Sequence, residues 1–433
     1  MATRRKLCIG MSLAPTWLSG EGWRADDSNI DGLFSSDFAL DIARMAEAVH
    51  LDFVFRPDTL YLPMERLEQS FGFTSLDSTM LMAAIARETS HIGLVTTVST
   101  TLQQPYLVAR QLMSLHWLSK GRAGWNIVTA MQGQENFGME SLPKSEDRYA
   151  EAAEFTDVVH RLWASFPADA VLADRASGRY ADTSKIHPIN HAGRSYRIKG
   201  PLNLPAYPGP RVPLIQAGAS GAGRDFAAAT ADIVFAMTPD FDAAKELRDD
   251  LSARAVAHGR APEDIRVLPG IGLYLGETRV EAEALFSATH ARIPRERRLD
   301  KVLDALGLDL RNWPDARQVT AADLPPAKPR TAMLEARLRR LITAEAPTVA
   351  QLLNRHELVA APHWTIVGTV EDAVAEIAEW HGAGVIDGMI LAPCGSTRSM
   401  HIALQQLVPA LARAGLFRSA YTGTHFADHL GIA

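Results

Sequence analysis

Cysteine is scarce in this sequence, which holds only Cys8 and Cys394, near opposite ends of its 433 residues. There is no CxxC pair or other spacing that could ligate zinc, and no disulfide framework. The sequence also lacks an apolar run near the roughly 18 residues that a membrane-spanning helix needs. The N-terminal "MATRRKLCIGMSLAPTW" carries no signal-peptide pattern. We therefore expect a cytoplasmic protein that does not bind a membrane.

The sequence also has no excess of basic over acidic residues. The chain has 44 basic against 50 acidic residues, a net charge of −6, so no broad basic surface for nucleic acid is expected. Hydrolase signatures such as GxSxG and HExxH are missing. His187 and His191 have HxxxH spacing but lie in a proline-rich loop, so we predict no metal site.

What the sequence does contain is an alternation of apolar, β-prone segments with segments of helical periodicity. Strands are predicted at 6–13, 52–56, 92–99, 123–129, 212–219, 232–237, 265–276 and 388–393. Helices are predicted at 37–50, 76–90, 105–118, 146–164, 222–230, 240–257, 278–292 and 399–414. Eight continuous apolar strands favour an α/β fold, a closed (β/α)8 TIM barrel. A Rossmann sheet is the alternative, although no GxGxxG follows the first strand.

Two long segments interrupt this alternation. Residues 165–211 are rich in Pro, Gly, Asn and His, with a small hairpin predicted around Tyr196 to Ile198, and residues 293–362 are helical and highly charged. We interpret residues 1–433 as a single barrel domain with these two insertions. Long excursions from a barrel commonly shape its pocket, so we expect both to wall a substrate site.

Polar residues cluster just after the predicted strands, where a TIM barrel places its active site. They are Asp58 after the second strand, Thr97, Ser99, Thr100 and Thr101 at the third, Asn126 and Thr129 in the fourth, and Ser220 and Gly221 after the fifth. Such a set binds a ligand with many hydrogen-bonding edges but has little acid, base or nucleophile power, which indicates a cofactor that brings its own reactivity. Structural interpretations remain open, because Asp58 could cap a turn and the threonines could fill a strand. Asn126 is harder to explain that way, since a buried amide needs partners.

A glycine-bearing turn in "LIQAGASGAGRDFAAA", residues 214–229, joins a strand to a helix. Unpaired backbone N–H groups at such a helix start typically hold a phosphate. Close packing of the helix against the sheet is the alternative. Tyr149 lies in the first turns of a helix beginning near "KSEDRY", where it either packs or donates to the same phosphate.

Several long segments together closely resemble the nitrilotriacetate and dibenzothiophene sulfone monooxygenase family, a branch of the bacterial luciferase-like flavin monooxygenases. They are "GRAGWNIVTA" (121–130), "EDRYAEAAEF" (146–155), "GPLNLP" (200–205), "PLIQAGASGAGRDFAAATADIVF" (213–235) and "LVPALARAGLF" (407–417). The resemblance implies a luciferase-like TIM barrel that uses reduced FMN, delivered by a separate NAD(P)H:flavin reductase, and O2 to oxygenate a small organic substrate, with C–N or C–S cleavage as one outcome. It places Asp58, Thr97 or Thr101, and Asn126 near the flavin ring, and Tyr149, Ser220 and Gly221 at the FMN phosphate.

Two positions depart from the family pattern. Ser145 stands where the family usually has a histidine, four residues before the tyrosine matching Tyr149; a serine can still donate one hydrogen bond to phosphate. Arg56 in "FRPD" stands where small apolar residues are more usual. Either Arg56 or Arg194 could favour a carboxylated or sulfonated substrate, or each could be an ordinary surface charge.

The sequence leaves two alternatives to a flavin-dependent monooxygenase. One is a deazaflavin (F420)-dependent oxidoreductase of the same superfamily, and another is a flavin-binding protein without turnover. No residue is required as general base, although the titration range of His91, His116, His191 and His363 suits proton transfer. A homo-oligomer, dimer or tetramer, is expected for a large enzyme of this kind.

Overall fold

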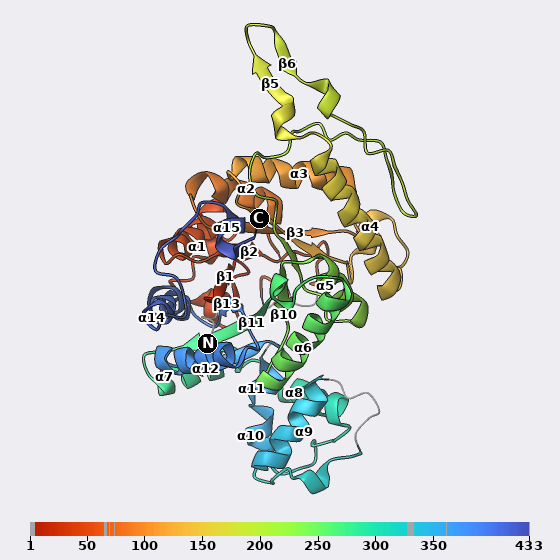
Figure 1. The fold of residues 1–433 in the computed structure, drawn as a ribbon. Coiled ribbons are helices and arrows are strands. Elements are labelled where there is room, and N and C mark those ends of the chain that lie inside the picture. Colours follow the sequence, from red (N-terminus) through yellow and green to blue (C-terminus); the bar gives the residue numbers. More distant parts are fainter. Residues whose placement is uncertain are drawn as a thin grey trace.

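The structure is a computed structural model that describes residues 5–64, 67–68, 70–72, 74–326, 333–360 and 362–432. Its centre is a closed barrel of eight parallel strands within these residues (Figure 1). In order around the barrel they are β1 (Cys8–Ser12), β2 (Phe53–Arg56), β3 (Gly93–Ser99), β4 (Ala123–Val128), β9 (Leu214–Gln216), β10 (Ile233–Ala236), β11 (Arg266–Leu275) and β13 (Gly388–Pro393). Pairing of β13 with β1 and of β10 with β11 closes the ring. The predicted (β/α)8 barrel is confirmed.

Where a helix was predicted, it begins within two residues of its expected start, and helices surround the barrel. They are α1 (Ser36–Ala48), α2 (Ser78–Glu88), α3 (Pro105–Leu118), α4 (Ser145–Ala164), α5 (Gly221–Thr230), α6 (Phe241–Ala257), α7 (Arg279–His290), α12 (Val370–Ala383), α13 (Thr397–Ile402) and α14 (Val408–Arg413). Side chains cap many of them: the Ser35 hydroxyl, for example, accepts the Phe38 N–H at the start of α1. The predicted helix 399–414 is α13 and α14 joined by a π-helical turn at Ala403–Leu407, since Pro409 has no N–H for the regular ladder.

Neither β12 (Trp364–Gly368) nor α12 was predicted. The strand β12 is a ninth parallel strand, paired with Ile271–Leu275 of β11, whereas β10 pairs only with Arg266–Pro269. Burial alternates along β12, so its five residues do not form the continuous apolar run by which the other strands were recognised. The strand β9 is also shorter than the predicted 212–219.

The insertion at 165–211 holds two antiparallel hairpins, β5 (Val171–Asp174) with β6 (Arg179–Ala181), and β7 (His191–Ala192) with β8 (Arg197–Ile198). The second is the hairpin predicted near Tyr196. It lies along α4, where the Glu154 carboxylate accepts the backbone N–H groups of Ser195 and Tyr196. The β5–β6 hairpin projects away from the barrel (Figure 1).

The insertion at 293–362 is helical, as predicted. It contains α8 (Arg295–Leu306), α9 (Met333–Glu345), α10 (Val349–Leu353) and α11 (His356–Val359). These helices pack around an apolar cluster of their own, which includes Val302, Leu338, Ile342 and Leu352. The insertion lies at the end of the molecule opposite the β5–β6 hairpin (Figure 1). Assignment of 1–433 to one domain stays a prediction.

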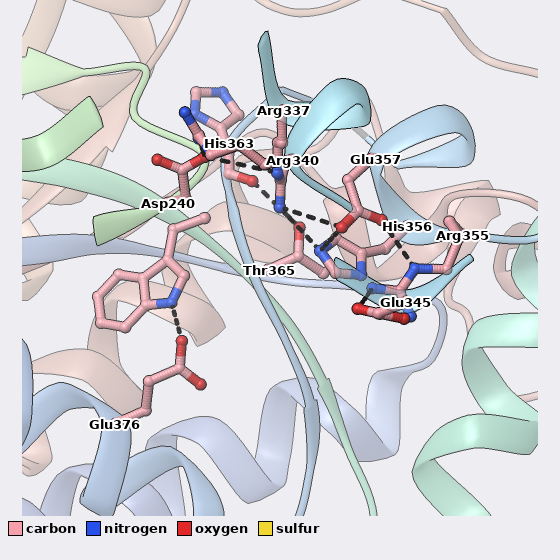
Figure 2. A network of polar contacts seen from close by, with 11 residues as sticks. Asp240, Arg337, Arg340, Glu345, Arg355, His356, Glu357, His363, Thr365 and Glu376 are labelled. Carbon is pink, nitrogen blue, oxygen red and sulfur yellow. Dashed lines mark hydrogen bonds and ion pairs between the residues drawn. The ribbon is translucent and has the colours of Figure 1, made fainter. Parts of the chain in front are cut away.

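Charged side chains connect this helical insertion to the barrel (Figure 2). Asp240 caps α6 just after β10, and its carboxylate accepts Arg340 Nη2 at 2.7 Å. Arg337 reaches the same carboxylate at 3.7 Å and contacts His356 Nε2 at 2.8 Å. Burial lowers the pKa of His356 to about 4, so its ring is neutral at physiological pH. The network therefore fixes α9 and α11 beside the carboxyl end of β10.

The opposite end of the barrel, at the amino ends of its strands, is closed by α15 (Phe426–Leu430). The Phe426 ring fits against β3 and β4 because Gly93 and Gly124 have no side chain there; a Cβ at these positions would lie 2.5 Å and 2.7 Å from the ring. Nearby, Arg418 pairs with the fully buried Asp52, whose other oxygen accepts the Ile9 N–H at 2.7 Å. Burial raises the pKa of Asp52 to about 6, although Arg418 opposes the shift. The pair connects the C-terminal segment to β1.

We expect Arg418→Met to lower the free energy of unfolding by about 3 kcal/mol at pH 8, because it leaves a buried carboxylate without its cation. Without Arg418 the folded-state pKa of Asp52 rises further above its unfolded value of 3.8. The folded variant then holds a proton that the unfolded chain has lost, so its stability falls as pH rises from about 5 to 8. Thermal unfolding at both pH values measures this. Arg413→Met, at the exposed end of α14, is the matched control and should behave as wild type at both; an equal deficit at both pH values for Arg418→Met would contradict the prediction.

Candidate functional site

Thr97 and Asn126 lie side by side on β3 and β4 near the carboxyl ends of these strands. Asn126 Nδ2 donates to Thr97 Oγ1 at 3.1 Å, and that hydroxyl donates to the carbonyl of Arg56 at 2.7 Å. Both side chains are buried. The amide oxygen of Asn126 is also buried, yet it accepts no hydrogen bond within the described chain. The pair thus offers one fixed, unsatisfied acceptor.

An aromatic group that the sequence analysis did not assign to the site accompanies this part of the barrel. The rings of Phe55 and Phe235 meet edge to face at 5.5 Å, and His363 stacks on Phe235 at 5.6 Å. Gly270 makes room for the histidine, since a Cβ there would lie 2.9 Å from His363 Nδ1. Burial lowers the pKa of His363, and its Nδ1 has no partner among the described residues.

The sequence did not identify the two phenylalanines as site residues, because an apolar residue within a strand is usually part of the hydrophobic core. The signal that could have identified them is their position near the ends of strands, with Phe55 one residue before Arg56. Of the four histidines considered for proton transfer, only His363 joins this group. His91 contacts the Gly423 carbonyl, His116 the Pro210 carbonyl, and His191 pairs with Glu154 outside the barrel.

Ser145 and Ser220 come together although 75 residues separate them. Ser145 is the first residue of α4 and Ser220 is the N-cap of α5, and their hydroxyl oxygens are 3.4 Å apart. The Ser220 hydroxyl accepts the Gly223 N–H at 3.1 Å, which leaves its own hydrogen free to donate. No side chain caps α4, and space is open beside Gly221 at the start of α5. Two helix N-termini therefore converge, and both favour an anion.

Tyr149 lies beside this pair. Its hydroxyl accepts Gln216 Nε2 at 3.4 Å, and its ring is 5.9 Å from that of Phe226. Two of the three glycines in this segment are needed for this fit, since a Cβ on Gly218 or Gly223 would lie 2.5 Å or 2.7 Å from the Tyr149 hydroxyl oxygen. Tyr149 therefore packs against the turn and also lies beside the two serines, so packing does not conflict with a hydrogen bond to an anion.

Gln216 was missed by the sequence analysis. It is the last residue of β9, and its Oε1 accepts the Gly218 N–H at 2.7 Å. Because the strand was predicted to continue to residue 219, Gln216 was taken to lie within it rather than at its end.

Asp58 and Thr101 make local contacts. The Asp58 carboxylate accepts the N–H of Thr59 at 2.8 Å and that of Ser78, at the start of α2, at 3.2 Å. Burial raises the pKa of Asp58, and the two backbone donors oppose that shift. Thr101 Oγ1 accepts the Ala130 N–H at 3.2 Å and so joins the segments that follow β3 and β4. These bonds are structural; the roles of both residues toward a flavin remain predictions.

Two cavities open among the loops that follow the strands. The larger, about 690 Å³, lies between the segments after β2 and β4 and includes Tyr61, Met131 and Glu140. The smaller, about 290 Å³, lies between the segments after β1 and β2. Neither is lined by residues of 165–211 or 293–362, which we had expected to wall the pocket.

Within the part of the chain that the structure describes, no helix is long and apolar enough to cross a bilayer. In the same residues, no group of three or more His, Cys, Asp and Glu side chains could hold a metal ion.

Residues 16–387 match the family described as luciferase-like monooxygenase. The chain is 34% identical to nitrilotriacetate monooxygenase component A of Aminobacter aminovorans, over 100% of this chain and 98% of the relative. Its fold superposes on that of EDTA monooxygenase from Chelativorans sp. BNC1 with a TM-score of 0.83 at 26% identity, covering 99% of each chain. A riboflavin lyase solved with modified FMN and riboflavin gives a TM-score of 0.79 at 29% identity, covering 99% of this chain and 96% of the lyase.

Gly223→Ala should lower the free energy of unfolding by about 1–3 kcal/mol, because the added methyl overlaps the Tyr149 hydroxyl. Helix propensity alone predicts the opposite sign, since alanine is favoured over glycine by about 1 kcal/mol in a helix. Gly221→Ala, in the same helix with nothing within 4 Å of its Cβ, is the matched control and should be neutral or slightly stabilising. Urea unfolding of the two variants decides this, and equal stabilities would show that the turn is not tightly packed on Tyr149.

Proposed function

Because the chain belongs to the luciferase-like monooxygenase family, we propose that it is the oxygenating component of a two-component, FMN-dependent monooxygenase. A separate NAD(P)H:flavin reductase would supply reduced FMN, and O2 would be the co-substrate. The family that the sequence resembles is confirmed, and with it the prediction that the chain is a monooxygenase. The substrate would be a small organic molecule.

The convergence of Ser145 and Ser220 at two helix N-termini carries this proposal. The two hydroxyl groups, one of which donates to the other, the free N–H groups of the first turn of α4 and the positive ends of both helix dipoles suit a phosphate monoester. Tyr149 adds a phenolic group at the same place, and the absence of a side chain at Gly221 leaves room for the ligand. The terminal phosphate of FMN fits this donor set.

The ring of FMN fits the other group of residues. Asn126 Oδ1 is an orphaned, buried acceptor, and a ring N–H would satisfy it. When bound, reduced FMN would supply the chemistry that activates O2. Asn126 and Thr97 would orient the ring, and Phe55 and Phe235 would exclude water from it. His363 is neutral at physiological pH because burial lowers its pKa, so its Nδ1 can accept a proton beside Phe235.

We expect Ser220→Asp to weaken FMN binding by about tenfold or more, since it sets a carboxylate against the phosphate. Riboflavin has the same ring and no phosphate, so its affinity should be unchanged. Ser145→His, which restores the usual family residue, should tighten FMN binding and again leave riboflavin unaffected. Fluorescence titration of both flavins measures the differences. Equal losses for FMN and riboflavin in Ser220→Asp would place the phosphate elsewhere.

With a flavin reductase, NADH, FMN and a substrate, the protein should consume O2 in proportion to the substrate oxidised. A deazaflavin-dependent oxidoreductase would instead reduce or oxidise its substrate without O2. A flavin-binding protein without turnover would bind FMN and show no substrate-dependent uptake. An oxygen electrode separates the three outcomes when uptake is compared with and without substrate; added catalase returns half of the O2 that uncoupled oxidation converts to H2O2.

A further inference from the structure

The smaller cavity is mostly apolar yet holds a buried cation. Ala14, Pro15 and Leu18 line it from the segment after β1, and Pro57 and Phe71 from the segments after β2. Arg56, the last residue of β2, is the one arginine or lysine among its lining residues. A volume of about 290 Å³ suits a small organic molecule.

Arg56 is 8% exposed and poorly satisfied for a buried guanidinium. Nη1 donates to the Leu13 carbonyl at 2.6 Å, while the buried Nε has no partner. No carboxylate of the described residues lies within ion-pair distance of it. Burial lowers the pKa of Arg56, yet an arginine in a protein keeps its charge. A buried charge without a counter-ion is costly, so an anion that enters this cavity gains by pairing with it.

Asp58 is the one acidic residue among those that line the cavity, but it does not form an ion pair with Arg56. Its two oxygens accept the backbone N–H groups of Thr59 and Ser78, and it raises the pKa of Arg56 only through its field. The guanidinium therefore keeps donors for a ligand.

The cavity also adjoins the proposed flavin site. The backbone carbonyl of Arg56 accepts the hydroxyl of Thr97, which in turn accepts the amide of Asn126. The backbone of Arg56 is thus connected to the side chains that would orient the ring, and Asp58, which is predicted to lie near the flavin, lines the same cavity. Arg194, the other arginine considered from sequence, is exposed and pairs with Asp147, so it has its counter-ion already.

We propose that this cavity is the subsite for an anionic group of the substrate, a carboxylate or a sulfonate, with Arg56 as its specificity-determining partner. The proposal rests on the proposed function, since it concerns the substrate of that same site. The apolar walls would contact the carbon chain, and the guanidinium would pair with the anionic end.

The test uses three probes of equal chain length, hexanoate, hexanesulfonate and hexanamide, titrated by ligand-observed NMR into the full-length protein with FMN present. The wild type should bind both anions about tenfold or more tightly than the neutral amide, as a charge-assisted hydrogen bond implies. Arg56→Leu should remove this preference. Arg87→Leu, the same charge loss at a side chain that is 90% exposed on α2, should keep it.

Arg56→Gln is the second variant if Arg56→Leu does not fold, because glutamine keeps a donor for the Leu13 carbonyl but has no charge. Equal binding of the three probes by the wild type overturns the proposal, as does a preference that survives loss of Arg56. Flavin titration of the same variants separates a cofactor role: if loss of Arg56 weakens FMN binding and leaves the anion preference intact, Arg56 belongs to the flavin site. If no protein binds FMN but the anion preference depends on Arg56, the subsite stands and the flavin proposal fails.

Discussion

Parallel closure of the barrel is the constraint on which the rest of the structure depends. Because every strand runs in the same direction, all of the carboxyl ends meet at one rim, and residues remote in sequence become neighbours there. Ser145 and Ser220 are brought within 3.4 Å in this way, and so are Phe55 and Phe235, whose rings are 5.5 Å apart. The amino ends need only be filled, and Phe426 fills them against two glycines. The two ends of one sheet therefore differ: one holds the residues of the proposed ligand site, and the other is filled by packing.

Hydrogen bonding at the rim divides its polar residues into two kinds. Asp58, Thr101 and Gln216 have their acceptors occupied by backbone N–H groups, and so hold the loops in place. Asn126, Arg56 and His363 each retain a buried polar atom without a partner. Since a folded chain satisfies nearly all of its buried polar groups, these three atoms support the flavin and substrate sites that we propose. They lie on three different segments, on β4, on β2 and before β12.

The sequence predicted the barrel well because its strands are continuous apolar runs and its helices are capped by recognisable residues. The glycine turn before α5 predicted an anion at that helix start, whereas only the family resemblance put Ser145 and Ser220 at the same phosphate. The prediction failed where a residue's role depends on its neighbours. Phe55 and His363 carry no local signal of function, because one looks like core and the other precedes a strand whose pattern was too short to recognise. Gln216 was not identified, because the predicted strand ended three residues beyond the true end of β9.

The attachment of β12 has a consequence for how the molecule comes apart. The barrel is closed by pairing of β10 and β13 with Arg266–Leu273 of β11, while β12 adds its hydrogen bonds beyond β10, to Ile271–Leu275. Detachment of β12 would therefore leave the eight-stranded ring intact. His363, one residue before β12, would move with it and lose its stacking on Phe235, without unfolding of the barrel.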